Sequence, residues 1–407
     1  MQCGCGQRHW GRFGAAGLLL ADGLDTDGLD TDGLDTDGLD TDELDADELD
    51  AGELDADRPA GAGDADEGVA QGVAGSQMAG SEVGAGTVAA GGVTGSQVQA
   101  GGSVVLQHRA PWSHHGDTWG IPGGARNSEE TAVQAAVREA GEEAGVHGPV
   151  RPHATHELAH PDWSYTTVLA RAPARLAVRA TDAESVEVRW HPIERVTELP
   201  LLGAFEAAWP LLRQMLATRA VLVVDAANVV GSRPDGWWRD RAGATSRLTR
   251  RLSVLAQQGV PAGLLDLPGH TWWPAVVVVT EGRARAAADA PGVEVIRAEA
   301  DGDDTIVHVV REAGATGSDH HSATAGATGD EGGHDVSDDV GDEGACSSET
   351  ATDSGAGPSN TGSAPRTVRT QVSVVTADRE LRRRVVSAGA RVVGPGSLWR
   401  VLDALPH

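Results

Sequence analysis

Three glutamates in the middle of the chain have the spacing of a metal site. Glu139, Glu142 and Glu143 stand at positions i, i+3 and i+4, so a helix would place their three carboxylates on one face. Like charges that close repel each other. A hard divalent cation between them would relieve that repulsion, because such cations prefer oxygen ligands. The spacing therefore predicts a Mg²⁺ or Mn²⁺ site on a helix.

A glycine-rich approach precedes this helix. The run WGIPGG, residues 119–124, allows backbone to come close to a ligand or a metal. Asn127 or Ser128 is predicted to cap the helix, and Asn127 with Glu130 has capping-box spacing. Glu130 and Arg138 are two turns apart, too far to touch along one helix. They can meet only if Glu130 lies on a loop that folds back.

The whole stretch from Gly124 to Val146, GARNSEETAVQAAVREAGEEAGV, resembles the signature of the Nudix hydrolases. In that signature a Gly is followed after five residues by Glu and after seven more by Arg-Glu. Two residues then precede Glu-Glu, and one more residue precedes the final Gly. The resemblance implies an α/β/α sandwich with a mixed sheet that cleaves a diphosphate linkage in a nucleotide or nucleotide derivative. It implies an NTP pyrophosphohydrolase reaction dependent on Mg²⁺ or Mn²⁺. The residues it assigns to catalysis or metal binding are Glu130, Arg138, Glu139, Glu142, Glu143 and the backbone of Gly124.

Within this set the roles differ. Glu142 and Glu143 are expected to be direct metal ligands, and Glu139 is expected to be either a further ligand or the general base. Nudix enzymes often use one more acid just before a strand that ends in Trp. Glu184, six residues before Trp190, fits that position best, with Glu187 as the alternative. Four aromatic or imidazole side chains could line a base pocket, although packing is the more common role for each: His156, His160, Trp163 and Tyr165.

The acidic residues are unevenly distributed along the chain. The net charge is −28, but residues 22–67 hold 20 acids and Arg58 as their one base, and residues 318–365 hold 10 acids and no base. The remainder is close to neutral, so the overall charge says little about the ligand of a folded site. Only 3 cysteines occur, and no apolar run is long enough to span a bilayer. We therefore expect a cytoplasmic protein without a membrane partner.

Low-complexity sequence interrupts the first domain. From Asp22 the pentapeptide DGLDT occurs four times, and a five-residue period matches neither a helix nor a strand. One leucine per repeat cannot bury a core, so we predict a disordered insertion over residues 22–103. Strand-like sequence at 12–20 and 104–109 flanks it, and these strands should adjoin in a hairpin. With strands at 166–170 and 186–190 and a closing helix at 201–217, kinked at Pro210, the Nudix-like domain is predicted to span residues 1–217.

The remaining residues, 218–407, predict a second α/β domain. Apolar strand-like runs alternate with helical segments, which is typical of a parallel sheet covered on both faces. A second low-complexity segment, at about 315–366, is predicted to be a disordered insertion in this domain. The expected strands are 219–225, 275–280, 293–296, 372–376 and 391–393, and the expected helices are roughly 239–257, 304–313 and 379–388.

Aspartates gather where these strands should end. Asp225 closes the first strand, Asp303 and Asp304 open a helix, and Asp378 follows the VSVVT strand. This order resembles the PIN-like nucleases of the NYN type. The resemblance implies that Asp225, Asp304 and Asp378 hold Mg²⁺ or Mn²⁺ for phosphodiester hydrolysis, supported by Asp303, with Glu281 as a possible extra acid. The alternative is that each aspartate only caps a helix.

The functional expectation combines both domains. The chain is predicted to be a Nudix-type pyrophosphohydrolase acting on a nucleotide or nucleotide derivative, joined to a metal-dependent ribonuclease. Arginines beside the second site could neutralise RNA: Arg239, Arg379, Arg382 and Arg383. Two alternatives are RNA 5′-end processing coupled to RNA cleavage, and a Nudix enzyme carrying a PIN-like module that binds RNA without cutting it.

Overall fold

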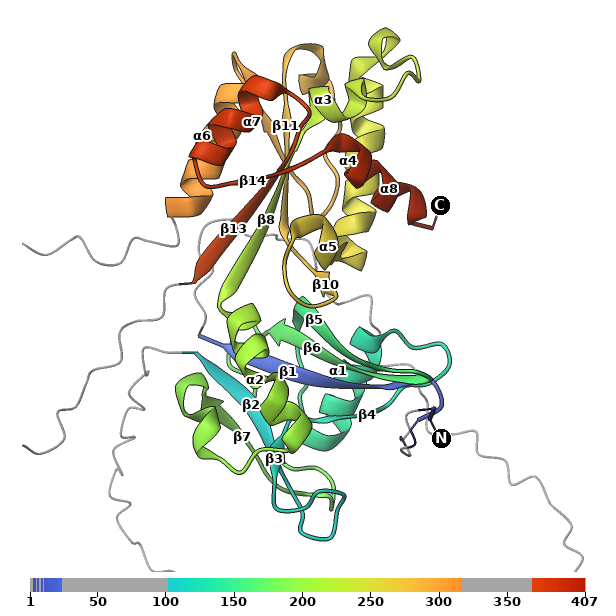
Figure 1. Ribbon diagram of the computed structural model, residues 1–407, viewed down its shortest axis with the longest axis vertical. Coiled ribbons are helices and arrows are strands. Elements are labelled where there is room, and N and C mark those ends of the chain that lie inside the picture. The colour runs from blue at the N-terminus through green and yellow to red at the C-terminus, as the bar shows by residue number, and fades with distance from the viewer. Residues whose placement is uncertain are drawn as a thin grey trace, which may run out of the picture. The chain divides into compact units, whose positions relative to one another are not determined.

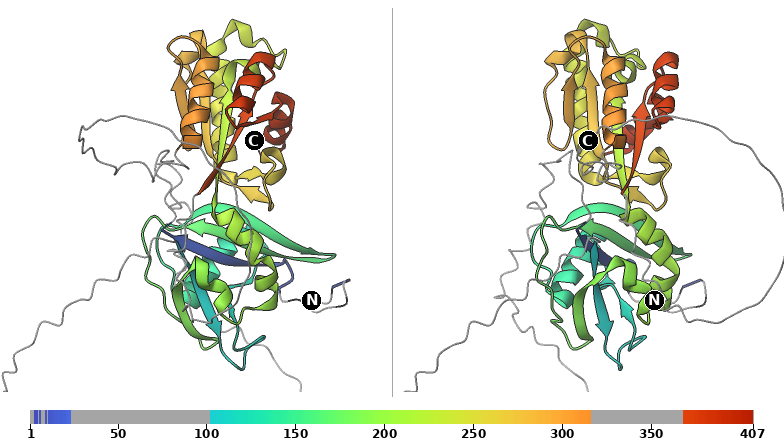
Figure 2. Two further views of the ribbon diagram at one scale, coloured as in Figure 1. Left: turned by 60° about the vertical axis from the view of Figure 1, so that its left-hand side comes forward. Right: turned by 90° about the vertical axis from the view of Figure 1, so that its left-hand side faces the viewer.

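The computed structural model of the chain describes residues 3, 4, 6, 9, 11–23, 102–315 and 368–406 (Figures 1 and 2). Both predicted insertions lie outside these residues except at their edges. In the described ranges, no helix combines the length and apolar character that crossing a membrane requires. The two halves of the chain are built on two different sheets.

The first half is built on a mixed sheet. Strand β1 pairs in parallel with β6 and antiparallel with β2 and β4, β7 pairs with β2, and β5 with β6. The order along the main path is β3-β2-β1-β6-β5, continued by β10 (Thr271–Trp272) and β9 (Val260–Pro261). The strands of this half are β1 (Ala15–Asp22), β2 (Ser103–Arg109), β3 (Trp119–Gly120), β4 (Gly123–Ala125), β5 (Arg151–His160), β6 (Trp163–Arg171) and β7 (Ser185–Pro192).

The hairpin predicted around the first insertion is confirmed. Ala21 pairs with Val104, and Asp22 pairs with Ser103. The predicted limits of the insertion, 22 and 103, are wrong by one residue at each end, because both residues belong to strands. Asp22 extends the pairing, since its carboxylate accepts a hydrogen bond from the Ser103 amide (3.1 Å).

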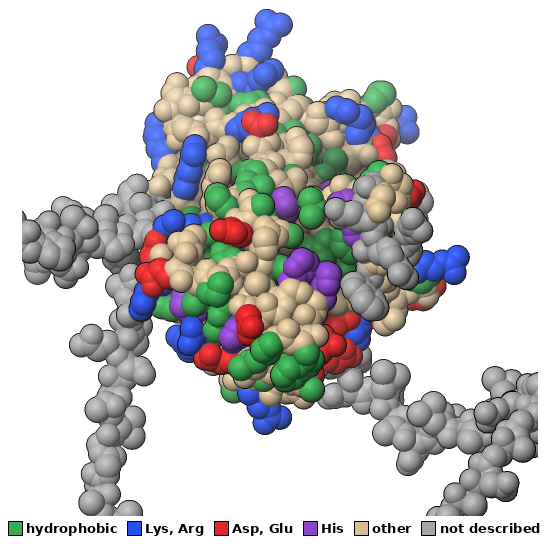
Figure 3. All heavy atoms as spheres, turned by 60° about the horizontal axis from the view of Figure 1, so that its bottom comes forward, with side chains coloured by type: hydrophobic (Ala, Val, Ile, Leu, Met, Phe, Trp, Pro, Cys, Tyr) green, Lys and Arg blue, Asp and Glu red, His purple; other side chains and the backbone are tan. Residues whose placement is uncertain are grey.

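One helix covers each face of this sheet. Successive side chains of β1 contribute to two different hydrophobic cores, one on each face of the sheet. Leu18 and Leu20 pack in the core that includes α1 (Ala132–Ala144), whereas Leu19 and Ala21 pack in the core that includes α2 (Gly203–Leu216). Helix α1 buries only alanines, which lets its backbone approach the sheet closely. Helix α2 continues through Pro210, and the short 3-10 helix η2 (Ile193–Glu198) precedes it. The face drawn in Figure 3 mixes acidic, basic, histidine and hydrophobic side chains, with neither sign of charge dominant.

The second half is built on a five-stranded sheet in the order β12-β11-β8-β13-β14, and every pair is parallel, as predicted. Helices α6 and α7 pack on one face, while α4 and α8 pack on the other (Figure 2). The strands are β8 (Thr218–Asp225), β11 (Ala275–Thr280), β12 (Glu294–Arg297), β13 (Arg369–Val375) and β14 (Arg391–Val393). The helices are α3 (Ala226–Gly231), η3 (Trp237–Arg239), α4 (Arg241–Gln258), η4 (Gly282–Ala286), α6 (Gly302–Ala315), α7 (Arg379–Ser387) and α8 (Pro395–Ala404).

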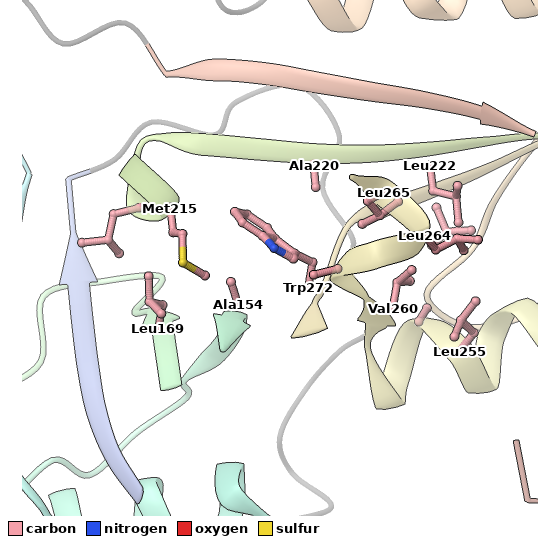
Figure 4. Close-up of a cluster of buried hydrophobic side chains, with 14 of the residues drawn as sticks. Ala154, Leu169, Met215, Ala220, Leu222, Leu255, Val260, Leu264, Leu265 and Trp272 are labelled. Atoms are coloured by element: carbon pink, nitrogen blue, oxygen red, sulfur yellow. The ribbon is translucent and has the colours of Figure 1, made fainter. Parts of the chain in front are cut away.

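A short hairpin was not predicted from the sequence. It comprises β9 (Val260–Pro261), α5 (Ala262–Leu265) and β10 (Thr271–Trp272). Although it follows residue 218, β10 pairs with β5, with Trp272 opposite Ala154. Figure 4 shows the Trp272 side chain between Met215 and Ala154 on one side and the leucines of α5 on the other. Trp272 is fully buried, so this indole extends the core of the first sheet into the hairpin.

Candidate active site

Helix α1 positions the three glutamates, and its start differs from the prediction. Thr131, not Asn127 or Ser128, is the N-cap. Its hydroxyl accepts from the Gln134 amide (3.2 Å), and the Gln134 side chain accepts from the Thr131 amide (2.9 Å), which completes a capping box. Gly145 ends the helix in the left-handed conformation (φ 62°).

The loop before α1 folds back over the helix, as the Glu130–Arg138 pair required. Arg138 Nε lies 2.6 Å from Glu130 Oε1, and Arg138 Nη2 donates to the Ala125 carbonyl (3.0 Å). Glu130 also accepts from the Asn127 amide (2.8 Å). The hydrogen bonds from Arg138 are the main reason that the pKa of Glu130 falls to about 2. This pair clamps the glycine-rich loop to α1.

Arg138 also contacts two of the three glutamates. Its Nη1 lies 3.0 Å from Glu139 Oε1 and 3.0 Å from Glu142 Oε2. The Glu139 side chain is 13% exposed and Glu142 is 59% exposed. Burial raises the pKa of Glu139 despite the nearby guanidinium. A β-carbon on Gly124 would lie 2.5 Å from the Glu139 carboxylate, so the glycine leaves the space that this carboxylate occupies.

Glu143 lies on the same face and reaches the adjoining glycine. Its Oε2 accepts from the Gly123 amide (2.9 Å). Burial raises the pKa of Glu143 to about 7, and the negative charges of Glu139 and Asp182 add to that shift. The sequence therefore brings all three glutamates, the clamp and the two glycines into one site.

The chemistry of this site suits a hard divalent cation. Its potential ligands are carboxylate oxygens, and burial penalises the charged forms of Glu139 and Glu143, which a bound cation would favour. In the described part of the chain, no three His, Cys, Asp or Glu side chains are grouped closely enough to hold a metal ion. The Arg138 guanidinium lies between Glu139 and Glu142, so a bound cation would compete with it for these two carboxylates.

The additional acid before β7 has more than one candidate. Glu184 is 64% exposed, and its Oε2 lies 3.8 Å from Arg109 Nη2. The alternative, Glu187, pairs with Arg189 (3.1 Å). Sequence reasoning missed Asp182, whose charge acts directly on Glu143. Its position three residues before β7 is the signal that could have found it.

Asp182 is held in a short hydrogen-bonded chain. The Ser185 hydroxyl donates to Asp182 Oδ1 (2.5 Å) and accepts from Gln107 Nε2 (2.7 Å). Gln107 is 1% exposed, and its Oε1 has no partner among the described groups. These hydrogen bonds fix the Asp182 carboxylate beside α1.

The predicted base-pocket residues divide into two groups. His160 and Trp163 line a cavity of about 300 Å³ at the β5–β6 turn, and His9 stacks on Trp163 with ring centroids 4.3 Å apart. Tyr165 lies closer to the glutamates, and burial, followed by the charge of Glu143, raises its pKa. His156 does not line that cavity, and burial lowers its pKa.

A second candidate site lies at the carboxyl ends of the parallel strands. A cavity of about 210 Å³ there is lined by the side chains of Asp225, Asn228, Glu281, Asp303 and Asp378. Asp303 rather than the neighbouring Asp304 faces it. The Asp304 carboxylate is 72% exposed and pairs with Arg384. The structure thus brings together three of the four predicted aspartates and the optional Glu281.

Hydrogen bonds hold the carboxylates of this cavity. Asp225 accepts from the Asn228 amide (3.0 Å) and from the Thr376 hydroxyl (2.9 Å), and burial raises its pKa. Asp378 accepts from the Glu380 and Leu381 amides (2.8 Å each). Asp225 therefore caps α3 and Asp378 caps α7, which confirms the helix-capping prediction for these two aspartates.

Capping does not account for Asp303. Burial, followed by the charges of Asp225 and Asp378, raises its pKa to about 6. Such repulsion among oxygen ligands favours a cation in this cavity as well. Sequence reasoning missed Asn228 and Thr376, although Asn228 stands three residues after Asp225.

The arginines predicted to bind nucleic acid lie on two elements. Arg239 ends η3, and Arg379, Arg382 and Arg383 lie on α7. Arg383 pairs with Glu380, so it is partly neutralised.

Comparison with known proteins decides the family of the first site. Residues 88–215 match the family profile described as NUDIX domain. The chain carries a Nudix domain. Its motif helix, α1, and the clamp of Glu130 and Arg138 fall within the matched residues.

Two curated relatives and a solved structure are similar to parts of this chain. A protein named "Putative 8-oxo-dGTP diphosphatase 3" from Mycobacterium tuberculosis is 48% identical over 123 residues, 28% of this chain and 56% of the relative. A "Nucleoside triphosphate pyrophosphatase/Nudix hydrolase fusion protein" from Bifidobacterium longum is 41% identical over 110 residues, 26% of this chain and 23% of the relative. The crystal structure of the Nudix hydrolase RenU from M. smegmatis is 30% identical and covers 53% of this chain and 92% of that chain, with a TM-score of 0.33. The chain thus spans about half the length, or less, of these curated relatives.

Proposed function

We propose that the Nudix domain is a metal-dependent pyrophosphohydrolase that cleaves a phosphoanhydride bond in a nucleoside triphosphate. The observation that carries this proposal is the single helix face of α1, which bears Glu139, Glu142 and Glu143 and on which Glu143 reaches the Gly123 amide and Glu139 lies against Gly124. An all-carboxylate site beside glycine backbone suits a cation and the phosphate oxygens that it binds.

Each residue has a separate task in this proposal. Glu142 and Glu143 hold the cation, and the Gly123 amide orients Glu143 through its 2.9 Å hydrogen bond. Glu139, buried below Gly124 with a raised pKa, accepts the proton of the attacking water or supplies a further ligand. When bound, the cation would neutralise phosphate oxygens and help to ionise that water. Glu130 and Arg138 keep the loop and the helix in register.

Oxidised guanine nucleotides are the first substrates to try. The name of the M. tuberculosis relative, 48% identical over the shared 123 residues, specifies 8-oxo-dGTP. The B. longum relative is named as a fusion of a nucleoside triphosphate pyrophosphatase with a Nudix hydrolase, so its name assigns no substrate to the Nudix part. We therefore propose a purine nucleoside triphosphate as the substrate class.

The test measures products from dGTP, 8-oxo-dGTP and the other triphosphates with Mg²⁺ or Mn²⁺. We expect a nucleoside monophosphate and pyrophosphate, with turnover lost in Glu142→Gln. The matched control is Glu206→Gln, which alters an exposed glutamate on α2 instead. Equal loss in both variants, or no turnover of any triphosphate, would overturn the assignment.

We propose a second, separate activity for the parallel-sheet half, the PIN-like or NYN-type cleavage of RNA with Mg²⁺ or Mn²⁺. The cavity of Asp225, Asp303 and Asp378 supports it, because acids from three elements meet where each parallel strand ends. Asp225 and Asp378 are the proposed ligands, with Asp303 taking the place first predicted for Asp304. Internally labelled RNA should be shortened by the wild type and left intact by Asp225→Asn.

The same labelled RNA, given a 5′-triphosphate, separates the remaining possibilities. Release of phosphate from the 5′ end, abolished by Glu142→Gln, would support coupled processing of RNA ends. Binding without any shortening would support a PIN-like module that binds RNA but does not cut it. Turnover of free nucleotides alone would leave the Nudix domain as an enzyme of the nucleotide pool.

A further inference from the structure

Exposed arginines flank the second cavity on two sides. On one side, Arg379 and Arg382 lie in the first turn of α7, immediately after Asp378. On the other side, Arg283 and Arg285 lie in η4, immediately after Glu281. Asp378 and Glu281 both line the cavity, so each pair of arginines starts within a few residues of its wall.

A third basic segment adjoins η4. Arg239 ends η3, and Arg241 and Arg247 lie in the first two turns of α4. The Ala288 amide donates to the Ser246 hydroxyl (2.9 Å), which holds the segment after η4 against this part of α4. Across the described ranges, none of the arginines of η3, η4 and these two turns forms an ion pair. Their charges are therefore available to an anionic partner.

An exposed indole stands within this basic segment. Trp238, in η3, is 54% exposed. Its ring meets Trp237 edge-on, with centroids 6.2 Å apart and planes at 84°. Trp237 itself packs against the core, and the Arg241 guanidinium lies 5.2 Å from its ring centroid. Trp238 is thus held beside an anchored neighbour while its own ring stays accessible.

We propose that these groups form a track for single-stranded nucleic acid across the second cavity, with Trp238 stacking on an unpaired base. The inference rests on the proposed nuclease function, which requires a phosphodiester at the carboxylates. Arginines on both sides of the cavity suit a continuous phosphate backbone better than a small anion. The indole favours a single strand, because the faces of the bases in a duplex are already covered by stacking.

Binding, not cleavage, tests the track. The full chain carrying Asp225→Asn is titrated against a fluorescent oligonucleotide of about 15 nucleotides, as single-stranded RNA, as single-stranded DNA and as duplex. Adding Trp238→Ala should weaken single-strand binding by roughly fivefold or more, whereas Trp238→Phe should retain most of it. Trp112→Ala is the matched control, since Trp112 is 75% exposed in the Nudix half. The RNA and DNA arms identify which single strand is preferred.

The salt dependence tests the arginines separately. Replacing Arg283 and Arg285 together with alanine should lower the slope of log K against log salt by about 0.7 per lost phosphate contact. Arg311→Ala is the control, because this exposed arginine lies in the second half of α6, away from the cavity.

The outcomes separate the track from the nuclease proposal. Unchanged affinity in Trp238→Ala, or duplex bound as tightly as single strand, would overturn the track. Intact binding by wild type without cleavage would instead reject the nuclease and leave the track standing.

Discussion

Replacing Gly124 with alanine should disable the Nudix site without unfolding it. Gly124 does not have positive φ, so its backbone conformation suits alanine. The new β-carbon, however, would lie 2.5 Å from the Glu139 carboxyl carbon and from Oε2. The Glu139 carboxylate is the end of a flexible side chain, so it can move away at little cost in stability. It must then leave its position beside the glycine-rich loop.

The size of the effect follows from that overlap. Ordinary contact with a β-carbon begins at 3.4 Å, so the carboxylate must move by about 0.9 Å. A displacement of about 1 Å at a reacting group costs on the order of 100-fold in rate, or roughly 2.7 kcal/mol. The free energy of unfolding should change by less than about 1 kcal/mol. The ion pair of Glu139 with Arg138 (3.0 Å) resists the movement and sets its direction.

Gly123→Ala is the contrasting variant. A β-carbon there would lie 2.6 Å from the Ala16 carbonyl and would also overlap Gly17, and both obstacles are backbone of β1. Backbone cannot retreat as a side chain does, so this variant should lose about 1–3 kcal/mol of stability.

The assay pairs kcat/KM for pyrophosphate release with thermal unfolding of the same samples. We expect Gly124→Ala to be folded and nearly inactive, and Gly123→Ala to have a clearly lower Tm. Wild-type activity in Gly124→Ala would show that Glu139 does not act from the observed position. A large loss of Tm in Gly124→Ala would show that the contact is structural.

Three further predictions concern stability and metal binding. Glu130→Gln should cost about 2 kcal/mol at pH 7, after allowance for screening, since Arg138 depresses the pKa of Glu130 to about 2. That stabilisation is full above pH 4.5 and lost as pH falls towards 2, so urea unfolding of both proteins should converge there, and a constant gap would contradict the assignment. Burial lowers the pKa of His153 to about 3. The free energy of unfolding of wild type should therefore fall by about 1.4 kcal/mol per pH unit as pH falls from 6.5 towards 3. His153→Gln should flatten this slope, and an unchanged slope would show that another group titrates. Mn²⁺ should raise the Tm of Asp225→Asn less than that of wild type, because Asp225 is a proposed ligand; equal shifts would argue against a cation in the second cavity.

The sequence predicted best those features that one local pattern determines. The spacing of Glu139, Glu142 and Glu143 fixes a shared helix face, and the structure shows that face. The contact of Glu130 with Arg138 was also predictable in outline, because the two residues can meet only if the loop that carries Glu130 folds back over the helix. The N-cap did not follow, since several residues before α1 are good caps. Thr131 forms the cap because Gln134 completes its capping box.

Features that depend on tertiary contacts were not predictable. Strands β9 and β10 have two residues each, too few to show a period, and pairing with β5 and burial of Trp272 stabilise them. Neighbouring aspartates on a helix point about 100° apart. The sequence could not tell which of Asp303 and Asp304 faces the cavity, and packing of α6 decides for Asp303.

The most direct test of the account is pyrophosphate release from 8-oxo-dGTP by the full chain with Mg²⁺. Wild type, Glu142→Gln and Asp225→Asn are compared under identical conditions. We predict turnover by wild type and Asp225→Asn alike, and loss of turnover in Glu142→Gln. Turnover that survives in Glu142→Gln, or disappears in Asp225→Asn, would contradict a hydrolytic site on α1.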